Sequence, residues 1–364
     1  MKISRSATYA VGVLAAAALI AGCSGNASQT GAPPAPNSLS PSGHAAGSAP
    51  MGAKIDNAHS KFPGLSAFRA PQRVKSDRKK SWVSPAAKDA PRILFISDYG
   101  DNDIDMYLLP HFKLMGTLTG FSGPQGMCSD SSGNIWITNT NTSQIYQYSR
   151  TGTLLKTLSD PGYYPVGCAV NKTNGDLAVT NIVSTAGYAG NVMIYPNATG
   201  SGTPITNPNQ DEYFFPAYDT NGNLYVDGFS NAFYFILSQC TSSSCSTMNV
   251  SGGTINFPGG LNWDRVNSQL EITDQECTLG GSCAYATTVS GSTATVVGSS
   301  ELESTTGGTC DVDQPTLAPF SRYIAGGCIA SGSTASRWAY PAGGIPGSSA
   351  TGLSEPIGAA ISNK

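Results

Sequence analysis

Short runs rich in apolar residues alternate with turn residues from about residue 92 to the end of the chain. Residues 135–139 read Ile-Trp-Ile-Thr-Asn, and residues 144–148 read Gln-Ile-Tyr-Gln-Tyr. Runs of β-branched and aromatic residues bounded by Gly, Asn, Asp or Pro are typical of half-buried strands. Strong helix signals are absent from this part of the sequence. The pattern therefore predicts an all-β fold, which is a barrel, a sandwich or a propeller.

A unit of two strands and a tight turn recurs along residues 92–364, and such a repeat distinguishes among these folds. The first strand begins at Pro and leads to Asp or Asn, and the second strand ends in Asp, Asn or a similar small residue. Asn-Gly and Gly-Asn pairs in the turn supply the positive φ that tight hairpins need. Further alternating runs follow and raise the unit to four strands. The units begin at Pro124, Pro165, Pro216, Pro258 and Pro315.

This unit resembles the NHL repeat, in which Pro-x-Gly is followed by Asp, a Gly-Asn turn and an aromatic-Val-Ala-Asp strand. The match is good in the units that start at Pro124 and Pro165, partial at Pro216 and Pro258, and weak at Pro315. The resemblance implies a β-propeller in which each four-stranded unit is one blade.

The two ends of the repeat region supply the number of blades. Residues 93–98 match a second strand without its first strand, and residues 356–361 match a first strand without its second. Pairing the two fragments would complete one blade and close the ring, which leaves only short, protected edges. Five internal units and this composite unit predict a six-bladed β-propeller over residues 92–364. A seventh blade would have to come from residues 54–91, which lack strand signals.

The first 22 residues have the layout of a secretory signal. Lys2 and Arg5 precede an apolar run over residues 10–21, which is too short to span a bilayer comfortably. The run ends in Leu-Ile-Ala-Gly-Cys, which resembles a bacterial lipobox, and the resemblance implies cleavage before Cys23 and lipidation of its thiol. We expect a lipoprotein of the cell envelope, anchored in the membrane through Cys23. An incidental cysteine after an ordinary cleavage site is the alternative. By resemblance to sorting in bacteria with two membranes, Ser24 implies the outer membrane.

Residues 23–91 are predicted to form a disordered tether. Residues 24–53 are nearly all Gly, Ala, Pro, Ser and Asn, and residues 54–91 are poor in structure but basic. This basic stretch could lie on anionic lipid or act as a soluble spacer. Residues 92–364 carry 9 of the 20 Lys and Arg but 20 of the 23 Asp and Glu, a net charge of about −11. Such a domain has no basic footprint for nucleic acid.

Eight of the nine cysteines remain once Cys23 is set aside, an even number that indicates disulfides in an exported protein. Eight cysteines allow 105 pairings, but the spacing along the chain narrows the choice. The candidate pairs are Cys240 with Cys245, Cys277 with Cys283, Cys310 with Cys328, and Cys128 with Cys168. The first two pairs bracket short loops. Cys128 and Cys168 fall one step apart in the register of successive units, which would let them meet between neighbouring blades. Two buried free thiols are the alternative.

Oxygen-bearing side chains end the second strand in five units, on the face of the ring where these strand ends would converge. They are Asp98, Asn139, Asn181, Asp227 and Asp274. Together with water, three carboxylates and two amide carbonyls would meet calcium's requirement for six to eight oxygen ligands. Six-bladed lactonases of the gluconolactonase and paraoxonase type hold calcium in that general place, and the resemblance implies a similar site here. The alternative is that each side chain caps its own turn by accepting hydrogen bonds from nearby backbone N–H groups.

Two classes of function remain. The first is a binding or scaffold module of the envelope with a protein or glycan ligand at the propeller face. The aromatic residues would then line a mouth that holds the ligand, and packing between blades is their alternative role. The second is a calcium- or carboxylate-dependent hydrolase of the lactonase type. Only His111 lies in the domain, in a predicted hairpin at the blade rim, where it would be too far from the centre to act as a general base. The lack of a central histidine favours the binding module, and the ring of Asp and Asn keeps the hydrolase open.

Overall fold

The computed structural model describes residues 80–278, 281–330 and 332–364, all of which belong to one compact unit, Gly47–Lys364. Strands form nearly all of the regular structure in these ranges, with short 3-10 turns η2 (Pro85–Lys88), η3 (Thr140–Thr142) and η4 (Pro196–Ala198). The prediction of an all-β fold is confirmed. No helix in the same ranges is long and apolar enough to cross a membrane. The predicted signal peptide, Cys23 and the predicted tether up to residue 79 lie outside the described residues.

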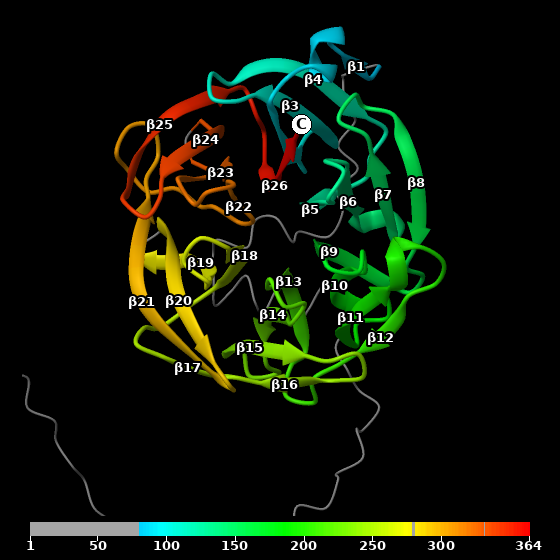
Figure 1. Cartoon of the computed structure of the whole chain (residues 1–364), viewed down its shortest axis with the longest axis vertical. Coiled ribbons are helices and arrows are strands. Elements are labelled where there is room, and N and C mark those ends of the chain that lie inside the picture. Colours follow the sequence, from blue (N-terminus) through cyan, green and yellow to red (C-terminus); the bar gives the residue numbers. More distant parts are fainter. Residues whose placement is uncertain (1–79, 279–280, 331) are drawn as a thin grey trace, which may run out of the picture. The chain divides into compact units, whose positions relative to one another are not determined.

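Antiparallel sheets follow one another around a common centre, and each runs from an inner strand to an outer edge (Figure 1). Three of these sheets have four strands in chain order. The first contains β5 (Pro124–Ser129), β6 (Ile135–Asn139), β7 (Gln144–Tyr148) and β8 (Leu154–Ser159). The second contains β9 (Tyr163–Val170), β10 (Leu177–Ser184), β11 (Ala189–Tyr195) and β12 (Thr203–Ile205). The third contains β13 (Glu212–Tyr218), β14 (Leu224–Phe229), β15 (Phe235–Cys240) and β16 (Cys245–Thr247).

A nine-stranded sheet continues the ring with two four-stranded meanders. The first contains β18 (Pro258–Asp264), β19 (Gln269–Thr278), β20 (Gly281–Ser290) and β21 (Thr293–Leu302), with β17 (Asn249–Ser251) parallel to β21. The second contains β22 (Thr316–Leu317), β23 (Tyr323–Cys328), β24 (Thr334–Ala339) and β25 (Gly343–Thr351). A single residue pair, Leu302 with Gly344, joins β21 to β25. Each meander therefore keeps the layout of the four-stranded sheets.

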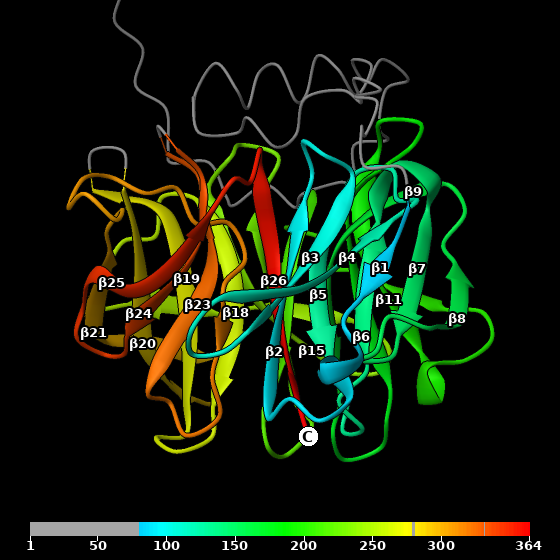
Figure 2. The ribbon, with the colours of Figure 1, turned by 90° about the horizontal axis from the view of Figure 1, so that it is seen from above.

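The two ends of the folded region share one sheet, in the strand order β1–β4–β3–β2–β26. Its strands are β1 (Trp82–Val83), β2 (Arg92–Asp98), β3 (Asp103–Leu108), β4 (Lys113–Thr119) and β26 (Pro356–Asn363). β26 is the innermost strand and pairs antiparallel with β2, from Asp98 opposite Pro356 to Arg92 opposite Asn363. Figure 2 shows β26 running beside β2 to the C-terminus at one face of the ring. The prediction that residues 356–361 supply the first strand of this sheet is confirmed.

The ordered domain begins before the predicted boundary at residue 92. Trp82–Val83 pairs with the edge strand β4, and Ala87 in the following turn is fully buried in the core. The guanidinium of Arg150 donates a hydrogen bond to the carbonyl of Ala90, which ties the same stretch to the neighbouring sheet. The prediction of a disordered tether is wrong for this stretch, because a two-residue strand has no periodicity that a sequence pattern can reveal.

The Pro-x-Gly pattern allows the inner strands of neighbouring sheets to approach closely. A Cβ atom on Gly126 of β5 would lie 2.2 Å from the carbonyl oxygen of Val166 in β9. A Cβ atom on Gly358 of β26 would lie 2.3 Å from the carbonyl oxygen of Gln125 in β5. Both distances are far inside van der Waals contact, so only Gly fits at these positions. The glycine of the repeat is therefore a requirement of packing between sheets.

Apolar side chains between neighbouring sheets form the core. Trp136 of β6 packs with Leu177 and Val179 of β10. Phe214 and Phe257 meet edge to face, with 5.8 Å between their ring centroids. Such aromatic pairs contribute about 0.5–1.5 kcal/mol beyond the area that they bury. These aromatic residues therefore serve packing between sheets and do not line a ligand-binding mouth.

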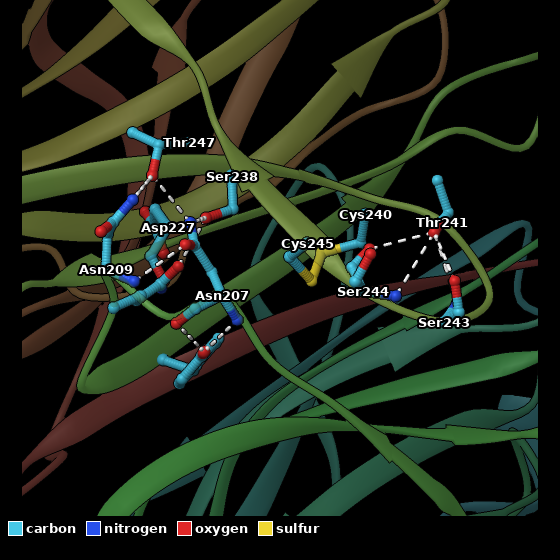
Figure 3. Close-up of a disulfide and its surroundings, with 12 residues drawn as sticks. Asn207, Asn209, Asp227, Ser238, Cys240, Thr241, Ser243, Ser244, Cys245 and Thr247 are labelled. Atoms are coloured by element: carbon cyan, nitrogen blue, oxygen red, sulfur yellow. Dashed lines mark hydrogen bonds between the residues drawn. A yellow bond between two sulfur atoms is a disulfide. The ribbon is translucent and has the colours of Figure 1, made fainter. Parts of the chain in front are cut away.

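The described residues contain four disulfides, and their pairing is the predicted one. They are Cys128–Cys168, Cys240–Cys245, Cys277–Cys283 and Cys310–Cys328. Cys128 of β5 and Cys168 of β9 lie on neighbouring sheets, with their Cα atoms 5.6 Å apart. Cys240 and Cys245 instead close a hairpin within one sheet (Figure 3). Only the first of these two bonds links separate parts of the ring.

We expect the Cys128–Cys168 bond to stabilise the ring far more than the hairpin bond does. Its 40-residue separation gives about 4 kcal/mol in the chain-entropy model, and the five-residue separation of Cys240–Cys245 gives about 2 kcal/mol. Replacing Cys128 and Cys168 by Ala should therefore lower the melting temperature by about 10 °C. Replacing Cys240 and Cys245 by Ala is the matched control, and calorimetry measures both. Equal losses from the two variants would contradict the expectation.

Candidate functional site

The ring has two faces that differ in their loops. On the proline face the chain enters the first strand of each unit, so Pro124 and Pro165 lie opposite Asn139 and Asn181 at the ends of the second strands. On the hairpin face tight turns join first and second strands, and the chain ends there at the C mark of Figure 2. The predicted ligand ring belongs to the proline face.

The five residues of the predicted ligand ring are all buried. They are Asp98, Asn139, Asn181, Asp227 and Asp274. Four of them accept hydrogen bonds from backbone N–H groups: Asp98, Asn139 and Asp274 from the loop that leads into the first strand of the unit, and Asp227 from Phe215 within the first strand β13. Asp98 accepts from the N–H of Ser354 at 2.7 Å and of Glu355 at 2.8 Å, the two residues before Pro356. Asn181 instead donates to the side chains of Asp160 and Asn191.

Four of these side chains are therefore held by backbone N–H groups, and Asn181 is held by neighbouring side chains. Burial raises the pKa of Asp98, Asp227 and Asp274, although backbone hydrogen bonds oppose the rise at each position. Among the described residues, no three His, Cys, Asp or Glu side chains are grouped so that they could hold a metal ion. The common calcium site at these residues stays a prediction. Turn capping explains the oxygens of Asp98, Asn139 and Asp274, which accept N–H groups that strand pairing leaves free. Oδ1 of Asn181 and Oδ2 of Asp227 have no hydrogen-bond partner among the described residues.

A separate pair of carboxylates lies in the segment that precedes β22. Burial and the nearby charge of Glu276 raise the pKa of Asp311 to about 7. Burial, Asp311 and Glu355 raise the pKa of Asp313 well above its ordinary value. Oδ1 of Asp311 and Oδ2 of Asp313 have no hydrogen-bond partner among the described residues. Carboxyl groups with such raised pKa values can take part in acid–base chemistry near neutral pH, or they make the stability of the domain depend on pH.

The hairpin face opens toward the centre of the ring through two adjoining cavities. They have volumes of about 160 and 400 Å³. The smaller is lined by residues from the first strands β5, β9, β13, β18, β22 and β26, so every sheet of the ring contributes to it. The larger extends beneath the loop after β22, and the two cavities share Lys172, Trp263 and Arg265. Together they have the size of a small-molecule or side-chain pocket.

Lys172 and Arg265 place two positive charges at this mouth. Each directly follows the residue that caps a hairpin turn: Asn171 Oδ1 accepts from the Thr173 N–H, and Asp264 Oδ1 from the Val266 N–H, both at 2.9 Å. Both cations are exposed residues. Protein atoms nevertheless desolvate the ammonium, and this burial together with the charge of Arg265 lowers the pKa of Lys172, which Asp130 opposes. Arg265 therefore lies close enough to Lys172 to disfavour the charged form of its ammonium group.

Aromatic and apolar groups lie beside these charges. Trp263 is half-buried; its indole N–H donates to Thr220 at 2.8 Å, and its ring stacks on Tyr225 at a centroid distance of 6.3 Å. Phe320 is 70% exposed. Phe320 and Ser321 both have positive φ, 71° and 51°, a conformation that costs free energy for residues other than Gly. An exposed aromatic ring on a strained backbone is typical of a binding surface.

Sequence reasoning missed this mouth. A signal was present, because Lys172 and Arg265 occupy the same position of the repeat, one residue after the capping Asn171 and Asp264. That position lies on the hairpin face, whereas our interpretation placed the chemistry on the proline face. Phe320 gave no signal, because its exposure depends on the loop after β22. His111 is exposed in the turn between β3 and β4, at the rim where it was predicted.

Comparison with known proteins supports the fold. The NHL repeat family matches residues 121–148, which span β5 to β7. A chain of a nidogen/laminin complex is similar, with a TM-score of 0.52 at 12% identity over 74% of this chain and 98% of that one. The chain has a β-propeller fold.

Two bacterial protein structures are also similar to this chain. A protein of unknown function from Bacteroides caccae has a TM-score of 0.56 at 10% identity, over 75% of this chain and all of that one. TolB from Acinetobacter baumannii has a TM-score of 0.55 at 9% identity, over 75% of this chain and 67% of that one. No curated protein sequence matches the chain. At these identities the likeness concerns the propeller alone.

Proposed function

We propose that this protein is a lipid-anchored, six-bladed β-propeller of the cell envelope that binds a partner at its hairpin face. The two meanders of the nine-stranded sheet count as separate blades, since one residue pair joins them; with the other four sheets they make six. The lipobox ending in Cys23 supports an anchor in the membrane, in the outer membrane where the organism has one. The similar chain from the nidogen/laminin complex belongs to a protein–protein assembly.

One observation carries the proposal. The mouth of the hairpin face combines a cavity to which every sheet contributes, two cations that have no ion pair or side-chain hydrogen bond within the described residues, and an exposed aromatic ring on a strained loop. Side chains that bind ligands commonly lie on loops that a rigid scaffold positions. On the proline face, backbone N–H groups already occupy the carboxylates of Asp98 and Asp274. Binding at the hairpin face is therefore favoured over chemistry at the proline face.

A photo-cross-linking experiment tests this function. The full chain would carry p-benzoylphenylalanine in place of Phe320, expressed in the envelope of its own host. The matched control places the same group at Leu155, which is 50% exposed on the outer strand β8. We expect a discrete adduct from position 320 and none from position 155. No adduct at position 320, or the same adducts from both positions, would overturn the proposal.

The hydrolase alternative is supported by the buried pair Asp311 and Asp313, whose pKa values are both raised. Carboxyl groups whose pKa values are raised by burial and by each other serve as general acids in many enzymes. Neither residue lines the cavities of the hairpin face, however, so a substrate bound there would not reach them. The binding function is therefore the better supported of the two.

A further inference from the structure

The mouth of the hairpin face continues into a longer groove. A third cavity, of about 690 Å³, lies between β2 and the β23–β24 hairpin and includes Arg92, Tyr323 and Arg337 in its lining. It shares Pro319, Phe320 and Asn363 with the cavity beside Trp263. The three cavities therefore form one continuous depression from the centre of the ring to its edge, which we call the basic groove.

Positive charge is concentrated in the basic groove. Residues 92–364 contain nine Lys and Arg, and five of them line it: Arg92, Lys172, Arg265, Arg337 and Lys364. Among the described residues, one acidic residue, Asp219, lines it, and its carboxylate already accepts the N–H groups of Asn221 and Asn223 at 2.8 Å. The domain as a whole has a net charge of about −11. A groove of opposite sign to the rest of the surface attracts an anion and repels a cation.

The two cations at the central end lack the kind of partners that Lys156 has. Lys156 donates to the carbonyl of Ala198 at 2.9 Å and lies over the ring of Trp136. Lys172 and Arg265 make no ion pair or side-chain hydrogen bond with any residue in the described ranges. Two like charges held near each other disfavour the fold, Asp130 offsets only part of that cost at Lys172, and a bound anion would offset more of it.

Apolar groups alternate with the charges along the groove. Trp263 and Leu317 lie beside Lys172 and Arg265, and Phe320 lies where the second and third cavities meet. A small anion would use only the central end. An extended polypeptide presents successive side chains to opposite sides, so it can place carboxylates on the cations and apolar groups against the rings. The length and the mixed lining of the groove therefore favour a peptide.

We propose that the basic groove binds an extended acidic segment of a partner protein, with its carboxylates at Lys172 and Arg265 and an apolar side chain against Phe320. This inference rests on the proposed binding function and adds the chemistry of the partner. The partner surface is a stretch in which Asp or Glu alternates with aromatic or aliphatic residues. Such contacts between charges depend on ionic strength, so binding should weaken as salt is added.

The test uses the full chain and a fluorescent eight-residue peptide in which Glu alternates with Phe and Leu. Fluorescence anisotropy should show saturable binding that weakens at least tenfold in Lys172→Glu. The matched control is Lys113→Glu, which makes the same charge change at an exposed lysine of β4 outside the groove and should bind as the parent does. A second peptide with Gln in place of Glu should bind at least tenfold more weakly.

Three outcomes would overturn the inference. Equal binding of the Glu and Gln peptides would exclude recognition of carboxylates. If Lys113→Glu weakened binding as much as Lys172→Glu does, the effect would come from the net charge of the protein and not from the groove. Succinate that displaces the peptide at the peptide's own concentration would make the site one for a small anion. If the peptide does not bind while the cross-link at position 320 forms, the acidic-segment inference fails and the binding function stands.

Discussion

Deleting residues 354–364 should prevent the domain from folding to a stable ring. The deletion removes β26, in which the residues from Pro356 to Ser362 are all buried, and leaves β2 without its inner neighbour. Ile357 and Ile361 alone bury side chains worth about 1.5–3 kcal/mol each. The loss therefore approaches the total stability of a typical domain, which is about 5–15 kcal/mol.

The contacts of β26 reach both neighbouring sheets, which is why its loss should affect the entire ring. The hydroxyl of Ser362 donates to the carbonyl of Gly133 at 2.5 Å, in the turn between β5 and β6. On the other side, Gly358 forms an isolated bridge with Gln314, whose side chain accepts the Met127 N–H at 2.8 Å. Without these links, unpaired strand edges face solvent and favour aggregation.

Circular dichroism and thermal unfolding of the full and shortened chains measure this effect. The matched control deletes Lys364 alone, which removes an exposed ion pair with Asp89 of 3.1 Å that contributes at most about 1 kcal/mol. A synthetic peptide of residues 352–364 added to the shortened chain should restore the transition, because it supplies the missing strand. A shortened chain with an unchanged melting temperature would refute the role of β26 in closure.

Much of this architecture could be predicted from the sequence, because the packing of each unit requires particular residue types at particular positions. Pro-x-Gly marks inner strands that approach closely, as at Gly126 and Gly358, and Asx residues mark the turns. Closure could be inferred since residues 93–98 and 356–361 are complementary halves of one unit. The register of Cys128 and Cys168 placed them on facing surfaces, and the structure bonds them.

The candidate site could not be predicted as well, for a physical reason. A repeat pattern tells which face a residue is on, but not which groups satisfy its side chain. Asp98 and Asp274 lie on the proposed face, yet backbone N–H groups of neighbouring loops occupy their oxygens. Conversely, Lys172 and Arg265 are candidate binding residues because they line the cavity and form no ion pair within the described residues. Only the packed structure shows this.

Raising the pH from about 5 to about 8 should destabilise the domain strongly. Burial raises the pKa of Glu271 and of Asp311 to about 7, and burial raises the pKa of Asp227 and Asp313 well above its ordinary value. A carboxyl group whose pKa is higher in the folded than in the unfolded state binds more protons when folded. Its stabilising contribution is complete below the unfolded pKa, near pH 4, and is lost as the pH rises through the folded value.

The expected size can be estimated for Glu271, which is fully buried. A rise in its pKa from 4.5 to about 7 corresponds to roughly 3 kcal/mol of stability lost across that interval. The pKa shifts of the other three groups have the same sign, so they add to this loss. At about 2–4 °C per kcal/mol, the melting temperature should fall by ten degrees or more between pH 5 and pH 8.

Glu271→Gln isolates one of these groups. Oε2 of Glu271 accepts a hydrogen bond from the amide of Asn262 at 2.6 Å, and Oε1 accepts one from the hydroxyl of Thr273 at 2.9 Å. A Gln side chain can keep both contacts, since its oxygen accepts from Asn262 and its amide donates to the Thr273 oxygen. The variant should match the parent at pH 5 and be more stable at pH 8, because a neutral side chain has no proton to lose. Glu301→Gln, at an exposed glutamate of β21, is the control, and it should follow the parent at both pH values. A parent chain that is as stable at pH 8 as at pH 5 would show that these carboxyl groups are ionised in the folded ring and that solvent or a counterion reaches them.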